Sequence, residues 1–195
     1  MKYLIAGLGN VGAEYKHTRH NLGFMVLDYL AKARGITFQN ERLANYGAGR
    51  YRGRILHMIK PLTYVNGSGQ ALRYWLQKCK VAITHSLVIV DDITLPLGVV
   101  RIKAQGGSAG HNGLKNIEMN LSTQTYPRLR IGIASHFARG QQADYVLAPF
   151  TSNEQQLLPK IIEQACEVVY TFCTSGVVYT MGKYNRNIAI GSAGK

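Results

Sequence analysis

Hydrophobic and polar positions along this chain follow two periods. Short apolar runs bounded by glycine, proline or polar residues predict strands, and apolar residues that recur every three or four positions predict helices. The predicted strands lie at residues 2–6, 44–51, 54–60, 86–92, 98–103 and 128–134. The predicted helices lie at residues 22–34, around Leu72 to Leu76, at 111–121 and along the apolar stripe from Leu157 to Phe172. Because strands and helices alternate, we expect an α/β fold with one twisted mixed sheet flanked by helices, an α/β/α sandwich.

The pattern near the C-terminus contains both a helix start and a helix breaker. Thr151 and Glu154 have the spacing of a capping box. Pro159 lies inside the same helical pattern and has no N–H to donate, so we expect a kink there or a regular helix that begins only near it. No linker-like stretch or repeat divides the chain. We therefore predict one domain over residues 1–187 and a flexible tail over 188–195.

The composition is typical of a globular protein with one core. The chain has 195 residues, 46% of them hydrophobic, and no window is long and apolar enough to cross a bilayer. A strand begins directly at the N-terminus, where a signal peptide would have a basic and an apolar region. The 3 cysteines lack CxxC spacing and are expected to be reduced packing residues. These features predict a soluble, cytoplasmic protein with no membrane partner.

Positive charge is concentrated in the first part of the chain. The formal net charge is +13, and residues 1–140 carry 19 of the 23 basic side chains but 6 of the 10 acidic ones. Such a surplus in a small domain attracts polyanions, whereas a basic surface that binds nothing would be the alternative. Membrane lipid is less favoured because the sequence has no basic amphipathic helix. The charge therefore favours a nucleic acid as the partner.

The first glycines match a well-known fingerprint. Gly7, Gly9 and Gly12 follow the first predicted strand with GxGxxG spacing, which is typical of dinucleotide-binding proteins. That site needs a helix that begins at the glycines, so that its N-terminus meets the pyrophosphate. Here the segment EYKHTRHN comes first, and the carboxylate that would bind a ribose is missing. We interpret the glycines as a tight turn, and tight binding of NAD or FAD would revive an oxidoreductase.

A second glycine-rich loop contains a possible nucleophile. Gly106, Ser108 and Gly110 match GxSxG, the nucleophile elbow of α/β-hydrolases. That fold requires the order serine, acid, histidine, but the last histidine is His136, so only Glu118 could be the acid within a very short span. We therefore interpret Ser108 as part of a loop, which can also bring backbone N–H groups to an anion.

Two short patterns raise the question of a metal. His17 and His20 have HxxH spacing, and Asp91 and Asp92 are adjacent carboxylates. The chain has no HExxH motif and no cysteine pair, and nothing in it selects a particular metal. We predict no metal site.

The remaining polar residues gather at predicted loop positions. They are Asn10, His20, Asn66, Asp91, His111 and Asn112. In an α/β sheet, connections at the carboxyl ends of parallel strands meet at one edge, so His20 and Asp91 can form an acid–base pair. An imidazole with a pKa near about 6.5 can take a proton from water at neutral pH, and a carboxylate on its other nitrogen fixes the tautomer. Each residue alone would be a common capping or turn residue.

These loops also resemble a known family. Four separated segments, GLGNVGAEYKHTRHNLG, KPLTYVNGSG, DDITLPLGVVRIK and GGSAGHNGLKNI, resemble the motifs of bacterial peptidyl-tRNA hydrolases, in the same order. The resemblance spans residues 1 to about 187. It implies hydrolysis of the ester that joins a peptide to the 3′-terminal ribose of tRNA, which recycles tRNA from aborted translation. It implies no cofactor, and we expect a monomer whose partner is the acceptor stem and 3′ end of peptidyl-tRNA.

The resemblance also implies a role for individual residues. His20 would be the general base that activates water, Asp91 would support its basic form, and Asn10 would distinguish blocked from unblocked aminoacyl groups. The residues that would contact the peptide and the terminal nucleotide are Tyr15, Tyr64, Asn66, His111 and Asn112. Lys103 and Arg130 match basic positions that contact tRNA phosphates.

Two departures from the family pattern affect loops near these residues. Val11 replaces the usual proline, so the backbone next to Asn10 loses a fixed φ angle. Val65 replaces the usual methionine, and its shorter β-branched side chain changes the shape of the expected peptide-binding wall. An RNA-binding protein that has lost turnover on the same scaffold remains the alternative, because such relatives can keep His20 and Asp91.

Overall fold

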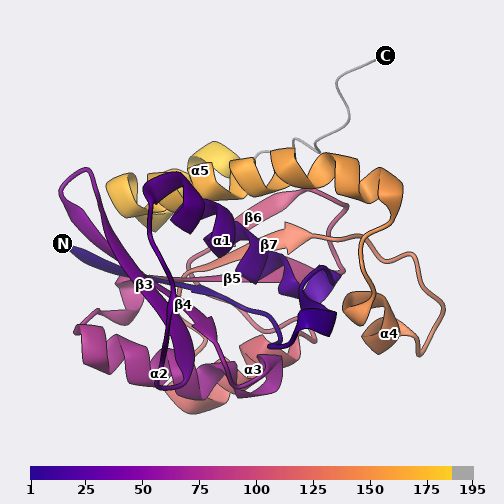
Figure 1. Ribbon diagram of the computed structural model, residues 1–195, viewed down its shortest axis with the longest axis horizontal. Coiled ribbons are helices and arrows are strands. Elements are labelled where there is room, and N and C mark those ends of the chain that lie inside the picture. Colours follow the sequence, from indigo (N-terminus) through magenta and orange to yellow (C-terminus); the bar gives the residue numbers. More distant parts are fainter. Residues whose placement is uncertain (186–195) are drawn as a thin grey trace.

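The computed structural model describes residues 1–185 as one mixed sheet covered by helices (Figure 1). The seven strands are β1 (Lys2–Gly7), β2 (Gln39–Glu41), β3 (Ala44–Tyr51), β4 (Arg54–Pro61), β5 (Ser86–Asp92), β6 (Val100–Lys103) and β7 (Arg128–Gly132). Their order in the sheet is β2-β3-β4-β1-β5-β7-β6. The parallel pairs are β1 with β4, β1 with β5, and β5 with β7, and β2, β3 and β6 join by antiparallel pairing. The predicted α/β sandwich is confirmed, and β2 is a strand that the sequence did not predict.

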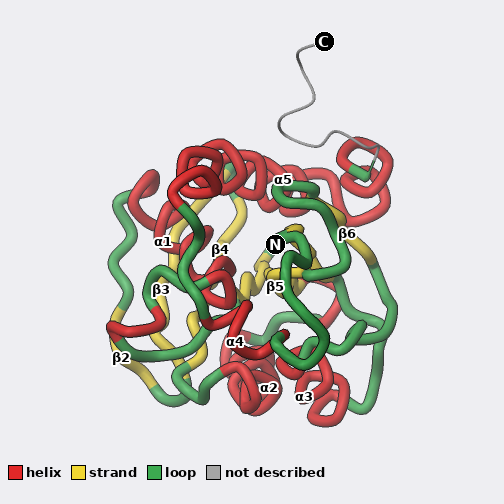
Figure 2. The backbone as a smooth tube through the Cα atoms, turned by 90° about the vertical axis from the view of Figure 1, so that its right-hand side faces the viewer, coloured by secondary structure: helices red, strands yellow, loops and turns green. Residues whose placement is uncertain are grey.

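Helices cover both faces of the sheet, as the two perpendicular views show (Figures 1 and 2). On one face lie α1 (Leu22–Arg34) and α5 (Ser152–Tyr184), and on the other lie α2 (Ser68–Cys79) and α3 (Asn112–Leu121). The short helix α4 (Gln142–Leu147) lies at one end of the sheet. Within residues 1–185, no helix combines the length and the apolar composition needed to cross a membrane.

The core consists of two layers because the central strands are buried on both faces. In β5, Leu87 and Ile89 belong to the cluster that includes α1 and α5, whereas Val88 and Val90 belong to the cluster that includes α2 and α3. This alternation explains why the strand is a continuous apolar run in the sequence. The three cysteines are free and buried, as predicted.

Helix α5 corrects one of the two alternatives predicted for Pro159, a regular helix that begins only near the proline. The capping box of Thr151 and Glu154 is formed, and the helix begins at Ser152, well before the proline. The backbone dihedrals stay helical through Pro159, and those that leave the helical region within α5 belong to Gly176, with φ 79° and ψ 171°. Burial of one face of α5 against the sheet outweighs the hydrogen bond that the proline removes. The predicted tail, 188–195, lies outside the described residues.

A glycine contact brings the start of α1 against the ends of two strands. A Cβ on Gly7 would lie 2.3 Å from the carbonyl oxygen of Gly23, and a Cβ on Gly23 would lie 2.5 Å from the backbone nitrogen of Leu8 and 2.6 Å from the oxygen of Ile89. Only glycine permits so close an approach of two backbones. Because the segment directly before α1 contains His20, this contact fixes that segment at the carboxyl edge of the sheet.

We predict that Gly23→Ala lowers the free energy of unfolding by about 1–3 kcal/mol, because a methyl group must be inserted between packed backbones. Gly182→Ala, at an exposed position in the last turn of α5, is the matched control: a Cβ there meets no atom within 4 Å, so alanine should leave stability unchanged or raise it by less than about 1 kcal/mol. Urea denaturation of both variants measures the difference. Equal effects of the two substitutions would contradict the close approach at Gly23.

Candidate active site

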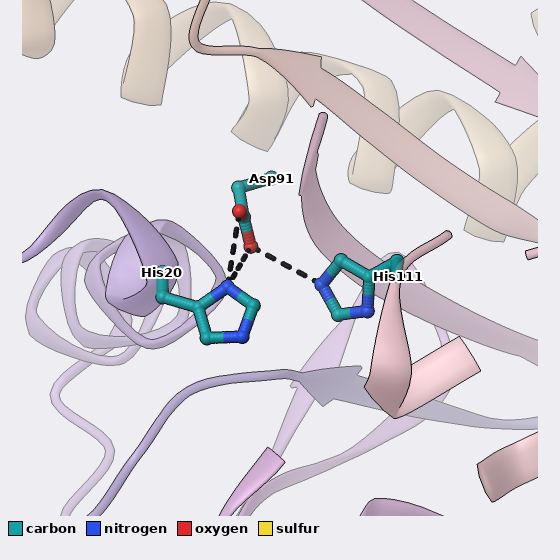
Figure 3. Close-up of side chains that lie close together, drawn as sticks. All are labelled: His20, Asp91 and His111. Carbon is teal, nitrogen blue, oxygen red and sulfur yellow. Dashed lines mark hydrogen bonds and ion pairs between the residues drawn. The ribbon is translucent and has the colours of Figure 1, made fainter. Parts of the chain in front are cut away.

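The carboxylate of Asp91 lies between the imidazole rings of His20 and His111 (Figure 3). It stands near the carboxyl end of β5 and is 4% exposed. Nδ1 of His20 lies 2.9 Å and 3.0 Å from its two carboxylate oxygens, and Nε2 of His111 lies 3.2 Å from Oδ1. His20 comes from a 3-10 helix, Arg19–Asn21, whereas His111 is the N-cap of α3. The predicted pairing of His20 with Asp91 is therefore present, and His111 joins it.

The hydrogen bonds determine which nitrogen of each ring is free. An ionised carboxylate only accepts hydrogen bonds, so Nδ1 of His20 donates to Asp91 and the neutral ring keeps an unprotonated Nε2. That Nε2 has no hydrogen-bond partner in the part of the chain that the structure describes, and it points away from Asp91 (Figure 3). His111 has the opposite arrangement, because its Nδ1 accepts from the backbone N–H of Leu114 while its Nε2 donates to Asp91.

Burial and charge act in opposite directions on the pKa values of this pair. Burial lowers the pKa of His20, but the charge and hydrogen bond of Asp91 raise it by more, so it lies above the ordinary value of 6.5. Burial also raises the pKa of the Asp91 carboxyl, yet His20 and His111 together hold it well below its usual range. Asp91 therefore stays ionised at neutral pH and favours the protonated form of His20.

Asn10 is held so that its amide N–H₂ group has no hydrogen-bond partner among residues 1–185. Its backbone N–H donates to Oδ1 of Asn21 at 2.8 Å, and Nδ2 of Asn21 donates to its carbonyl oxygen at 2.9 Å. The side-chain Oδ1 of Asn10 accepts from the backbone N–H of Val65 at 2.9 Å. With that oxygen occupied, Asn10 presents a hydrogen-bond donor. Asn21 thus holds the backbone of Asn10 next to the position where Val11 replaces the family's proline.

These residues line a cavity of about 910 Å³. It contains eight of the ten predicted site residues: Asn10, His20, Tyr64, Asn66, Asp91, His111, Asn112 and Arg130. Tyr64 is 54% exposed, and Tyr15 meets its ring edge to face, with centroids 6.3 Å apart, so Tyr15 lies beside the cavity. Lys103 is exposed and is not among the lining residues. The cavity has room for a ligand of drug-like size next to Nε2 of His20.

The two predicted phosphate-binding residues differ in their surroundings. Arg130 is 8% exposed, and its Nε lies 2.9 Å from Oδ2 of Asp92, so it forms a buried ion pair in the wall of the cavity. Lys103 lies at the end of β6, where it pairs in register with Arg128. Directly opposed residues share a face, so Lys103 lies on the face of Arg128. Residues two apart in a strand also share a face, so Arg130 lies on that face as well.

One wall of the cavity contains none of the predicted site residues. It is formed by Phe137, Arg139, Gly140 and residues of α4, namely Gln142, Ala143, Val146 and Leu147. Helix α4 has 6 residues, and its segment carries too few apolar positions to be recognised from periodicity. Asp92, which pairs with Arg130, was noted only as a neighbour of Asp91. Its position at the end of a buried strand was the sequence signal that could have identified Asp92 as a site residue.

The motifs that imitate other enzymes are resolved by the fold. Between β1, which ends at Gly7, and α1, which begins at Leu22, the chain forms two short 3-10 helices, so no α-helix starts at the GxGxxG glycines. Ser108 contributes its carbonyl oxygen to a turn, where it accepts from the N–H of His111. Both observations agree with the interpretation of these segments as loops.

Within residues 1–185, one group of three side chains could hold a metal, and its members already bond to one another. These are two imidazoles and one carboxylate: ligand atoms of His20, Asp91 and His111 lie within 4.8 Å of one another. His17, the other half of the HxxH pattern, is exposed and does not belong to this group. The hydrogen bonds of the two imidazoles to Asp91 account for the spacing.

Comparisons with known proteins agree on one family. The family model described as peptidyl-tRNA hydrolase matches residues 4–191. The peptidyl-tRNA hydrolase of Cytophaga hutchinsonii is 50% identical over 95% of this chain and 98% of its own, and that of Phocaeicola vulgatus is 47% identical over 95% and 100%.

A solved structure agrees as well. The crystal structure of peptidyl-tRNA hydrolase from Acinetobacter baumannii has a TM-score of 0.88 and 35% identity, and the match covers 94% of each chain. Both the sequence and the fold therefore match over nearly the whole length. This chain belongs to the peptidyl-tRNA hydrolase family, and it is an enzyme that hydrolyses peptidyl-tRNA.

Proposed function

We propose that His20 is the general base of this hydrolysis and that the cavity holds the ester between the peptide and the 3′-terminal ribose. Nε2 would take a proton from water as the oxygen attacks the ester carbonyl carbon. The bond between that carbon and the ribose oxygen then breaks, and the proton passes to the ribose oxygen. The products are a peptide carboxylic acid, which releases its proton to solvent, and a tRNA with an intact terminal hydroxyl, which is thereby recycled from aborted translation.

The single observation that carries this proposal is the hydrogen bond from Nδ1 of His20 to Asp91. It leaves Nε2 as the acceptor, and the negative charge of Asp91 stabilises the imidazolium that forms when the water loses its proton. His111 would hold Asp91 in place from the other side as a hydrogen-bond donor. An activated oxygen ester can be cleaved in this way without a covalent nucleophile.

Amide and aromatic groups would orient the substrate in the same cavity. We assign the free N–H₂ group of Asn10 to a carbonyl oxygen of a blocked substrate, because its Oδ1 is already engaged by Val65. Asn66 and Asn112 are exposed at the start of helical turns, where they can reach the peptide or the terminal nucleotide. The rings of Tyr15 and Tyr64 offer faces for stacking on a base.

Phosphate recognition would divide between an exposed and a buried cation. Lys103 is exposed and can neutralise a phosphate of the acceptor stem. Arg130 is buried beside Asp92, so it would contact only a phosphate of the 3′ end that enters the cavity. A monomer in the cytoplasm remains our expectation for the whole enzyme.

We predict that His20→Ala lowers turnover of N-acetylaminoacyl-tRNA by about 10²–10⁴-fold. Among the described residues that line the cavity, the other imidazole is that of His111, and both of its ring nitrogens are engaged in hydrogen bonds. The affinity for tRNA should change little. Release of the acyl group is followed with radiolabelled substrate, and affinity by filter binding.

Asp91→Asn is the companion variant. It keeps the size of the side chain but removes its charge, so turnover should fall while binding persists. Full turnover in His20→Ala would contradict the assignment of the base, and absent turnover in the unmodified protein would favour the inactive RNA-binding alternative.

We predict that Lys103→Ala weakens tRNA binding and lowers the slope of log affinity against log salt by about 1, because one phosphate contact is lost. Lys32→Ala is the matched control: it removes one exposed charge near the end of α1 that is remote from the cavity. Binding measured at several salt concentrations compares the two. An unchanged slope for Lys103→Ala, or the same change for both variants, would move the tRNA surface elsewhere.

A further inference from the structure

Arg19, the neighbour of His20, is a buried cation that neither the sequence motifs nor the proposed chemistry explains. It is 4% exposed. A buried guanidinium is costly unless charge and hydrogen bonds compensate it. Its surroundings therefore indicate what it holds together.

The partners of Arg19 come from one distant segment. Its Nη2 lies 2.7 Å from Oε2 of Glu154, and its Nη1 donates to the carbonyl oxygens of Pro149 at 2.8 Å and of Tyr145 and Ala148 at 3.3 Å each. The guanidinium also stacks on the ring of Tyr145, 4.3 Å from its centroid. Backbone pairing joins the same parts, because the N–H of Arg19 donates to the oxygen of Ala148.

Tyr145 lies in the last turn of α4, Ala148 is its C-cap and Pro149 follows. Carbonyl groups at the C-terminal end of a helix lack the usual partner four residues further on, and a cation next to them is favourable. The oxygen of Tyr145 also accepts from the N–H of Ala148, at 3.3 Å. Arg19 therefore caps α4 from outside. Glu154 completes the arrangement, because the same Oε2 also accepts from the backbone N–H of Thr151 at the start of α5.

Helix α4 depends on tertiary contacts. It has 6 residues, none of them fully buried, and a helix this short is unstable alone. Besides the contacts with Arg19, Tyr145 and Val146 pack against the core cluster that includes α1 and α5, and the hydroxyl of Tyr145 donates to the oxygen of Ile133 at 2.6 Å. Yet Ala143, Val146 and Leu147 form the apolar wall of the cavity that faces the site.

We propose that Arg19 is a positioning residue: with Glu154 it fixes α4 as the wall of the cavity against which bound substrate packs. Arg19 does not touch the reacting atoms, and its function is substrate affinity rather than proton transfer. The inference concerns the cavity of the proposed function, but it does not require His20 to be the base.

The test uses Glu154→Gln in the full-length enzyme. The variant keeps the size of the side chain but leaves the charge of Arg19 uncompensated, so α4 should loosen. KM for N-acetylaminoacyl-tRNA should rise by about tenfold, with kcat and its pH midpoint nearly unchanged. Hydrogen exchange of residues 142–147 should quicken more than exchange of α3. Glu41→Gln, which breaks an exposed ion pair with Lys78, is the matched control. It should change neither KM nor the hydrogen exchange of residues 142–147.

Arg19→Lys is the second variant if Glu154→Gln folds poorly. It keeps the positive charge but cannot bond to three carbonyl oxygens and a carboxylate at once, so KM should again rise in the folded enzyme. A purely structural role would lower the melting temperature and the active fraction but leave KM unchanged, which overturns the proposal. A shift of the pH midpoint at constant KM would also overturn it, by showing that Arg19 acts on His20. Loss of turnover in His20→Ala is a separate result and leaves this one intact.

Discussion

The buried carboxylate of Asp91 is the constraint on which the site depends. A carboxylate that is 4% exposed needs hydrogen-bond donors, and it obtains them from His20 and His111, which come from segments far apart in the sequence. The hydrogen bonds that Asp91 accepts thus fix the ring orientation and the tautomer of His20, and they hold His111 at the N-terminus of α3. They also raise the pKa of His20 above 6.5, so basicity and orientation have the same origin.

The backbone arrangement places His20 beside Asp91. Strands β1 and β5 are parallel neighbours, so the loop after β1 and the end of β5 share one edge. The close approach of Gly7 and Gly23 brings the loop back onto that edge. Arg19 belongs to the same 3-10 helix as His20, and its side chain reaches away from the sheet edge to α4 and Glu154. One short segment therefore carries both the proposed base and the anchor of the cavity wall.

The sequence predicted the parts of the molecule that have strong local signals. The α/β sandwich, the pairing of His20 with Asp91 and the capping box of Thr151 follow from periodicity, strand ends and spacing. The effect of Pro159 could not be predicted, because the burial that sustains α5 through it is tertiary. The α4 wall also has no local signal, since its position depends on contacts with Arg19 more than 120 residues away in the sequence. For Arg130, the pattern indicated a charge but not its burial beside Asp92.

The central claim is that Asp91 holds Nδ1 of His20 and leaves Nε2 as the base. Nitrogen-15 NMR of the imidazoles across a pH titration tests this most directly. The account predicts that neutral His20 carries its proton on Nδ1 and that the ring titrates above 6.5. A neutral ring protonated on Nε2, or a midpoint below that value, would contradict it.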